Sequence, residues 1–178
     1  MGVSPVPAPA AQRAGIAECR ELHGAVDEVV EPLVARHRER LKCRRGCFDC
    51  CVDELTVFEV EAEVIRAAHP DLLNSGVPAP QGRCAFLDAE GGCRVYASRP
   101  YVCRTQGLPL RWLEEDLEGE IVEQRDICPL NLEGPRLVDL PEADCFQLGL
   151  FEERLISVQL RAFSRLERVE LRSLFRQA

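Results

Sequence analysis

Apolar residues recur at steps of three and four along the first part of the chain, from about residue 11 to residue 41. This spacing puts them on one face of an α-helix and predicts a long amphipathic helix. Pro32 lies inside the stretch, so the helix either kinks there or breaks at Val30 and restarts with Pro32 in its first turn. The positions on this face are Leu22, Val26, Val29, Leu33, His37 and Leu41.

Two further segments have helical spacing. Thr56 and Glu59 match a capping box, and the apolar face that follows them continues until Pro70. From about residue 142 to residue 175, apolar residues recur at steps of three or four between mixed Glu and Arg, which predicts a third helix. We expect the first and last helices to pack on each other. A protein partner or a homodimer formed through this C-terminal helix is the alternative.

The pattern changes between residues 71 and 140, where Gly, Pro and Cys interrupt the chain. Only 108–113 and 120–123 are expected to pair, as a short hairpin. About 70 residues with little regular structure are unstable in a compact domain unless something holds them together. We therefore predict a mainly α fold, a single domain over 11–178 after a flexible segment at 1–10. Long amphipathic helices would frame an irregular, metal-organised, cysteine-rich middle region.

Composition and charge narrow the classes of function. The chain has 178 residues, of which 46% are apolar and 29% charged, as expected for one ordinary globular domain. Its net charge of −8 and aromatic content of 6% argue against nucleic acid or an anionic membrane as a partner. No apolar run reaches the roughly 18 residues of a membrane span. The N-terminal residues do not resemble a signal peptide, so we expect a cytoplasmic protein.

Ten cysteines are many for a chain of this length. Without a secretion signal, metal ligation is the preferred interpretation and disulfides are the alternative. Cys19 and Cys145 stand apart from the others and are expected to be small buried side chains. The other eight follow the spacing C-x3-C-x2-C-C, then C-x8-C-x9-C, then a final Cys-Pro. They are the predicted metal ligands, namely Cys43, Cys47, Cys50, Cys51, Cys84, Cys93, Cys103 and Cys128.

The first four of these thiols already suggest how the ligands divide. Gly46 leaves the backbone free to turn between Cys43 and Cys47. The side chains of consecutive residues diverge, so Cys50 and Cys51 are expected to serve different centres. Eight thiolates divide into two four-thiolate sites, one of which would use Cys43, Cys47 and Cys50. One site with additional structural thiols fits the same spacing.

The type of ligand restricts the metal. No histidine joins the cysteine pattern, and all-thiolate ligation suits zinc or an iron–sulfur cluster while excluding calcium and magnesium. The C-x3-C-x2-C spacing is better known from radical SAM iron–sulfur enzymes than from zinc sites, although this chain is too short for their barrel. The pair Cys128-Pro129 is similar to the Cys-Pro that closes bacterial ferredoxin motifs. We therefore favour a [4Fe–4S] cluster over zinc.

The segments CRRGCFDCC, TVFEVE and CAFLDAEGGCRVYASRPYVCR together resemble the YkgJ-like cysteine-cluster proteins, a family described as zinc- or iron-chelating. The resemblance covers roughly residues 43–128. It implies metal binding and a bacterial, cytoplasmic setting. Some relatives are associated with the methylation of lysine in flagellin, but they are larger proteins, and no glycine loop for SAM is present here.

Arginines lie close to the cysteines in sequence. Arg99 and Arg104 flank Cys103, and Tyr96 precedes them. These side chains either offset the negative charge of the thiolates or form an anion or substrate pocket over the cluster. No catalytic residue is identified, so two classes of function stay open. The chain is either a metal-binding module, or an iron–sulfur enzyme or electron-transfer protein, for example one that modifies proteins in the manner of a methylase.

Overall fold

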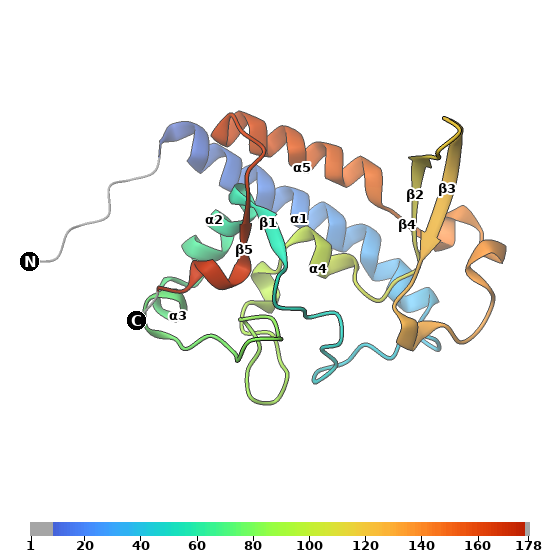
Figure 1. Ribbon diagram of the computed structural model, residues 1–178, viewed down its shortest axis with the longest axis horizontal. Helices are drawn as coiled ribbons and strands as arrows, with labels where there is room; N and C mark the ends of the chain where they lie inside the picture. The colour runs from blue at the N-terminus through green and yellow to red at the C-terminus, as the bar shows by residue number, and fades with distance from the viewer. Residues whose placement is uncertain (1–8, 177–178) are drawn as a thin grey trace, which may run out of the picture.

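The computed structural model describes residues 9–176, so most of the segment predicted to be flexible, residues 1–8, lies outside the described part. Two long helices, α1 (Ala10–Arg36) and α5 (Leu148–Phe163), lie side by side (Figure 1). A third helix, α2 (Glu59–Ala68), packs against both of them. The predicted packing of the first helix on the last is therefore confirmed.

The observed helices differ from the predicted ones at their ends. α1 continues through Pro32 without a break and ends before His37. α2 begins at Glu59, because the expected cap residue Thr56 belongs to a strand. The last helix ends at Ser164, which has a left-handed φ of 57°, and the chain continues into a strand and a 3-10 turn rather than in a helix to 175.

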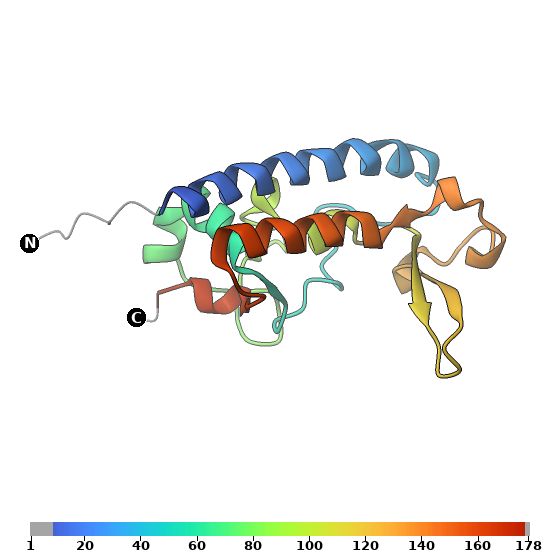
Figure 2. The ribbon, with the colours of Figure 1, turned by 90° about the horizontal axis from the view of Figure 1, so that it is seen from above.

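Two small sheets accompany the helices. In the first, β1 (Thr56–Phe58) pairs antiparallel with β5 (Arg168–Glu170). In the second, β2 (Leu110–Glu115) pairs antiparallel with β3 (Ile121–Asp126), and its other edge pairs in parallel with β4 (Phe146–Gln147). The β2–β3 pair confirms the predicted hairpin, which projects from the body of the molecule (Figure 2).

The predicted mainly α class is wrong. Of the described residues, 48% are helical and 13% lie in strands, so the fold is mixed α/β. The missed strands β1, β4 and β5 have two or three residues each, too few to produce an alternating pattern in the sequence. Two short helices, α3 (Pro70–Ser75) and α4 (Tyr101–Thr105), complete the set of α-helices in residues 9–176.

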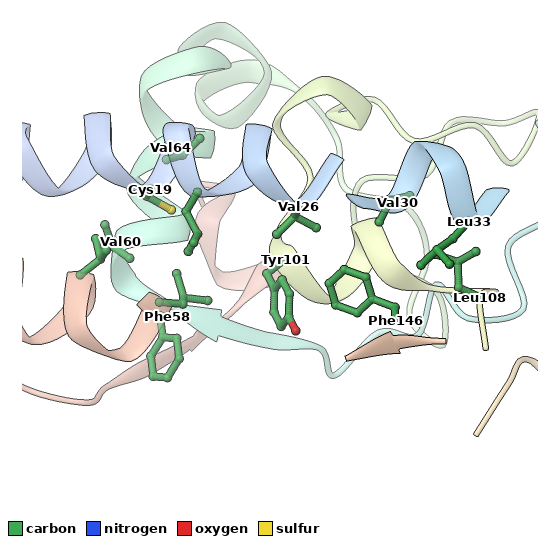
Figure 3. Packing of buried hydrophobic residues seen from close by; sticks show 13 residues of the cluster. Cys19, Val26, Val30, Leu33, Phe58, Val60, Val64, Tyr101, Leu108 and Phe146 are labelled. Carbon is green, nitrogen blue, oxygen red and sulfur yellow. The ribbon is translucent and has the colours of Figure 1, made fainter. Parts of the chain in front are cut away.

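The main apolar core lies between α1, α2 and α5. Tyr101 and Phe146 enter it from α4 and β4 and pack against α1, with their ring centroids 6.2 Å apart (Figure 3). At the far end of the pair, α1 and α5 approach so closely that a Cβ atom on Gly15 would lie 2.6 Å from the Cβ of Ala162. Glycine at this position is therefore what allows the two long helices to touch.

A second apolar core lies under the cysteine-rich loops. Phe86 and Val95 from the loop between α3 and α4 pack against Ile65 of α2 and against Leu171 and Phe175 near the C-terminus. The middle region is thus organised in part by its own apolar packing, which the cysteine pattern did not predict. Within residues 9–176 no helix is both long and apolar enough to cross a membrane.

Candidate metal centre

The eight patterned cysteines come from four separate segments. The first four follow α1, in the segment that leads to β1. Cys84 and Cys93 belong to the loop between α3 and α4, Cys103 lies on α4, and Cys128 follows β3. Seven of the eight therefore lie outside the α-helices and strands, in backbone that tertiary contacts must position.

One set of neighbouring thiols consists of Cys43, Cys47, Cys50 and Cys128. Burial raises the pKa of Cys43, and the nearby Cys47, Cys128 and Cys50 raise it further, while a hydrogen bond from Asn131 acts in the opposite direction. Cys43 and Cys50 are exposed, and Cys47 and Cys128 are partly buried. We call these four the outer set.

Asn131 joins the two chain segments that supply the outer set, and sequence reasoning missed it. Its side chain is fully buried, accepts a hydrogen bond from the Lys42 backbone N–H at 2.8 Å, and donates to the Gly107 carbonyl at 2.8 Å and to Cys43 Sγ at 3.6 Å. Its own backbone N–H donates to the Cys128 carbonyl at 2.8 Å. A single asparagine thus positions Cys43 next to Cys128.

Gly107 lies on the other side of Cys43. Its φ is +92°, in the left-handed region that glycine adopts easily, and an added Cβ atom would run into Cys43 Sγ. The only signals in the sequence for these two positions are the glycine that follows α4 and the asparagine that follows Cys128-Pro129. Neither signal indicates that these residues contact Cys43.

The other set consists of Cys51, Cys84, Cys93 and Cys103, and we call it the inner set. The Cys84 backbone N–H donates to the Cys51 carbonyl at 2.8 Å, and Cys93 forms an isolated antiparallel bridge with Leu87. Burial, and then the neighbouring Cys84 and Cys93 thiolates, raise the pKa of Cys103 to about 12. Cys84 belongs to the second apolar core and Cys51 and Cys93 pack against it. None of the four is exposed, so the inner set is the more buried one.

Cys50 and Cys51 lie where the two sets meet. A hydrogen bond from the Cys51 thiol is the main cause that lowers the pKa of Cys50 to about 6. The same hydrogen bond is the main cause that raises the pKa of Cys51, to which Cys84 and Cys103 also contribute. Cys50 also lies near Cys103, so it borders both sets.

The thiols are neighbours without forming a finished coordination shell. In the part of the chain that the structure describes, no three Cys, His, Asp or Glu side chains are already gathered closely enough to hold a metal ion. The chemistry of both sets, thiolates without histidine or carboxylate, fits zinc or an iron–sulfur cluster. Seven of the thiols lie in loops, whose backbone can move more easily than that of a helix or strand.

The predicted arginine and tyrosine residues lie together beside the inner set. The Arg99 guanidinium covers the ring of Tyr96 at 4.0 Å. Burial raises the pKa of Cys93, and a backbone hydrogen bond from Val95 and then the positive charge of Arg99 lower it. Arg99 Nε is buried and has no hydrogen-bond partner among residues 9–176. The guanidinium also lies 3.8 Å from the Asp27 carboxylate of α1, through Nη2, so its positive charge is shared between Asp27 and the region of Cys93.

Arg104 has a different environment. Its side chain is buried, donates to the Ala97 carbonyl at 3.0 Å and to the Arg99 carbonyl at 2.9 Å, and forms an ion pair with Asp27 of α1. Arg104 thus fastens α4, with Cys103 on it, to the long helix α1. Its part in an anion pocket stays a prediction.

The two cysteines outside the pattern are buried, as predicted. Cys19 is fully buried in the main core and Cys145 is 6% exposed beside β4. Burial is the main cause that raises the pKa of each thiol. Cys19 Sγ lies 3.7 Å from Nε2 of His23, which in turn lies 3.3 Å from the Glu61 carboxylate. Cys19 and Cys145 therefore both lie in the interior of the fold.

Comparison with known families agrees with this geometry. A family model named CxxCxxCC, described as a "Putative zinc- or iron-chelating domain", matches residues 42–129. The matched range begins one residue before Cys43 and ends one residue after Cys128, so it spans all eight patterned cysteines and excludes Cys19 and Cys145. No match was found among curated proteins or among solved structures.

Proposed function

Since residues 42–129 make this chain a member of the zinc- or iron-chelating CxxCxxCC family, we propose that it binds metal at two four-thiolate sites. One observation carries the proposal, namely that the eight thiols fall into an outer set (Cys43, Cys47, Cys50 and Cys128) and an inner set (Cys51, Cys84, Cys93 and Cys103). Four thiolates are the complete ligand set of a structural zinc ion or of a [4Fe–4S] cluster.

We further propose that the outer set holds a [4Fe–4S] cluster. Its spacing of C-x3-C-x2-C, together with the remote Cys128-Pro129, supports iron–sulfur over zinc. The low pKa of Cys50 favours ligation, because a metal binds the thiolate and not the thiol. An iron–sulfur cluster supplies one-electron transfer when it is bound.

The inner set connects three parts of the fold. Cys51 precedes β1, Cys84 and Cys93 lie in the loop over the second apolar core, and Cys103 lies on α4. A metal bound to these four would cross-link segments that otherwise meet through few hydrogen bonds. Arg94 and Arg99, which both lower the pKa of Cys93, would offset the net negative charge of a four-thiolate site.

An iron–sulfur enzyme or electron-transfer protein is the second candidate. Arg99 supports it, because its buried Nε has no hydrogen-bond partner within residues 9–176 and its guanidinium stacks on Tyr96, whose side chain is 65% exposed. An anionic substrate group would reach Arg99 beside Tyr96 and compete with Asp27, whose carboxylate lies 3.8 Å from Arg99 Nη2. A reversible potential and a substrate-dependent change in the spectrum of the purified protein would support this role.

The test is metal content after anaerobic purification, combined with the absorption spectrum and acid-labile sulfide. We expect two metal centres per chain, with iron and sulfide at the outer set, the loss of the outer centre alone in Cys47→Ser and the loss of the inner centre alone in Cys84→Ser. Cys19→Ala is the control and should keep all of it. A single mononuclear ion in fully loaded protein would overturn the two-site proposal, and zinc without sulfide would overturn the iron–sulfur assignment alone.

A further inference from the structure

A groove opens where the three-stranded sheet meets α5. β4 pairs with β2 only at Leu110 and Arg111, and the chain then turns into α5 at Leu148. Residues 112–115 of β2 therefore pair with β3 on one side and with no strand of residues 9–176 on the other. The space is about 390 Å³ and is lined by Trp112 and Leu113 of the strand and by Leu148, Leu150, Glu152 and Glu153 of the helix. We call it the edge groove.

The strand beside this groove is accessible to another chain. The end of the β2–β3 hairpin projects from the body of the molecule (Figure 2), and β2 beyond Arg111 pairs with no strand of residues 9–176 on the side away from β3. Leu113 and Leu150 are 62% and 59% exposed on the two walls. Folded proteins usually protect an open strand edge, because its backbone N–H and C=O groups can pair with another strand. An open edge beside apolar side chains is the arrangement that binds a peptide by strand addition.

Charge restricts what can bind there. Seven carboxylates lie on the hairpin end and the rim of the groove, and in the described part of the chain none of them forms an ion pair with Lys or Arg. Glu123 and Glu142 nearby, by contrast, are both paired with Arg111. A second copy of the chain would bring a second set of like charges against the first, whereas a cationic segment is attracted. The seven are Glu114, Glu115, Asp116, Glu118, Glu120, Glu152 and Glu153.

We propose that the edge groove binds an extended, cationic segment of a partner protein, which adds to the free edge of β2 as a further strand. Successive side chains of a strand point to opposite faces, so apolar residues of the segment pack on Trp112 and Leu150 while alternate Lys or Arg residues meet Glu152 and Glu153. Metal plays no part in this contact. The proposal therefore goes beyond the metal-binding function and stands or falls separately from it.

The first experiment uses a fluorescein-labelled octapeptide of alternating lysine and valine, with fluorescence anisotropy at low and at high salt. We expect saturable binding that weakens as salt rises, since ion pairs at the rim are screened. Octalysine lacks the apolar side chains and an alternating glutamate–valine peptide has the opposite charge. Each should bind at least tenfold more weakly. Equal binding by octalysine would overturn strand addition in the groove, because it would show attraction by charge alone.

Variants locate the site. Glu152→Lys with Glu153→Lys should weaken binding of the lysine–valine peptide at least tenfold, and Leu150→Ser should weaken it severalfold. The matched control is Glu28→Lys with Glu31→Lys, exposed carboxylates on α1 that carry the same change of charge away from the groove. The control should change binding less than twofold. An equal loss in the control pair would overturn the assignment to the groove.

Hydrogen exchange tests the binding mode directly. Added peptide should protect backbone amides in 112–115, and amides of α1 should not change. Binding without protection of β2 would overturn strand addition. The peptide-free chain could instead form a dimer that Glu152→Lys with Glu153→Lys abolishes. That result would show that a second copy occupies the groove and would also overturn the proposal.

Discussion

Replacing Asn131 should weaken the outer set of thiols more than any other change away from the cysteines. Asn131→Ala removes the acceptor for the Lys42 N–H and the donor to the Gly107 carbonyl, both at 2.8 Å and both in a fully buried place. It also removes the N–H that reaches Cys43 Sγ at 3.6 Å. Cys43 and Cys128 would then lose the link that holds them together.

The size of the effect follows from these contacts. The net contribution of one hydrogen bond to the free energy of unfolding is about 1 kcal/mol, and a buried polar group left without its partner lowers that free energy by about 1–3 kcal/mol. Two such bonds and the groups left behind give a loss of about 2–4 kcal/mol in the free energy of unfolding for Asn131→Ala. Loss of a residue that orients a metal ligand typically lowers metal affinity about 10- to 100-fold.

Asn131→Asp keeps a hydrogen-bond acceptor at this position but removes the donor. An aspartate still accepts the hydrogen bond from the Lys42 N–H but cannot donate to Gly107 or to Cys43. Its negative charge beside Cys43 also disfavours a thiolate there. We therefore expect Asn131→Asp to be no more stable than Asn131→Ala, because it buries an unpaired charge against the Gly107 carbonyl oxygen, and to bind metal at the outer set at least as weakly.

The assay is titration with Co²⁺, whose thiolate charge-transfer absorption counts occupied sites, together with denaturant unfolding of the metal-free protein. At limiting Co²⁺, both variants should lose the absorption due to Co²⁺ at the outer set and keep the absorption due to Co²⁺ at the inner set. Asn74→Asp, on the exposed surface of α3, is the matched control and should behave as the unmodified chain. Wild-type Co²⁺ affinity in a folded Asn131→Asp variant would refute the reasoning.

Three further predictions follow from individual residues. Gly107→Ala should lower metal occupancy at the outer set and cost about 1–3 kcal/mol because of its positive φ. The control is Gly119→Ala, with φ +84° in the hairpin turn, which should lower stability by a similar amount but keep all of the metal. Metal analysis of the two purified variants tests the difference. Burial raises the pKa of Cys19, so its contribution to stability is full below about pH 9 and is lost as pH rises above that value. Between pH 8.5 and 10, the free energy of unfolding of the metal-free protein should therefore fall less steeply with pH in Cys19→Ala than in the unmodified chain. The difference in slope should be up to about 1.4 kcal/mol per pH unit. Arg104→Ala should cost about 2–3 kcal/mol by denaturant unfolding, through lost hydrogen bonds to a charged donor, and speed hydrogen exchange in α4.

Sequence patterns predicted the elements that depend on local contacts. The apolar stripe of α1, the face of α2 and the β2–β3 hairpin each arise from residues within one turn or one short loop of each other, and all three are present. The end of α5 at Ser164 was missed, because the segment after it has helical spacing but pairs with β1 instead. Thr56 fits a helix cap by local pattern, but it lies in a strand because it pairs with Glu170, more than a hundred residues further along the chain.

By itself, the sequence determined the donor chemistry of this protein. Thiolates without histidine, their spacing and the charge of the chain are properties of the residues, and they lead to the metal-binding family without coordinates. Only the tertiary structure decided which thiols are neighbours. Cys43 meets Cys128 through Asn131, which is 88 residues away from Cys43, and Cys51 meets Cys84 through a backbone hydrogen bond between two loops. Such contacts depend on how α1, α2 and the second apolar core bring distant segments together, and no spacing along the chain encodes that distance.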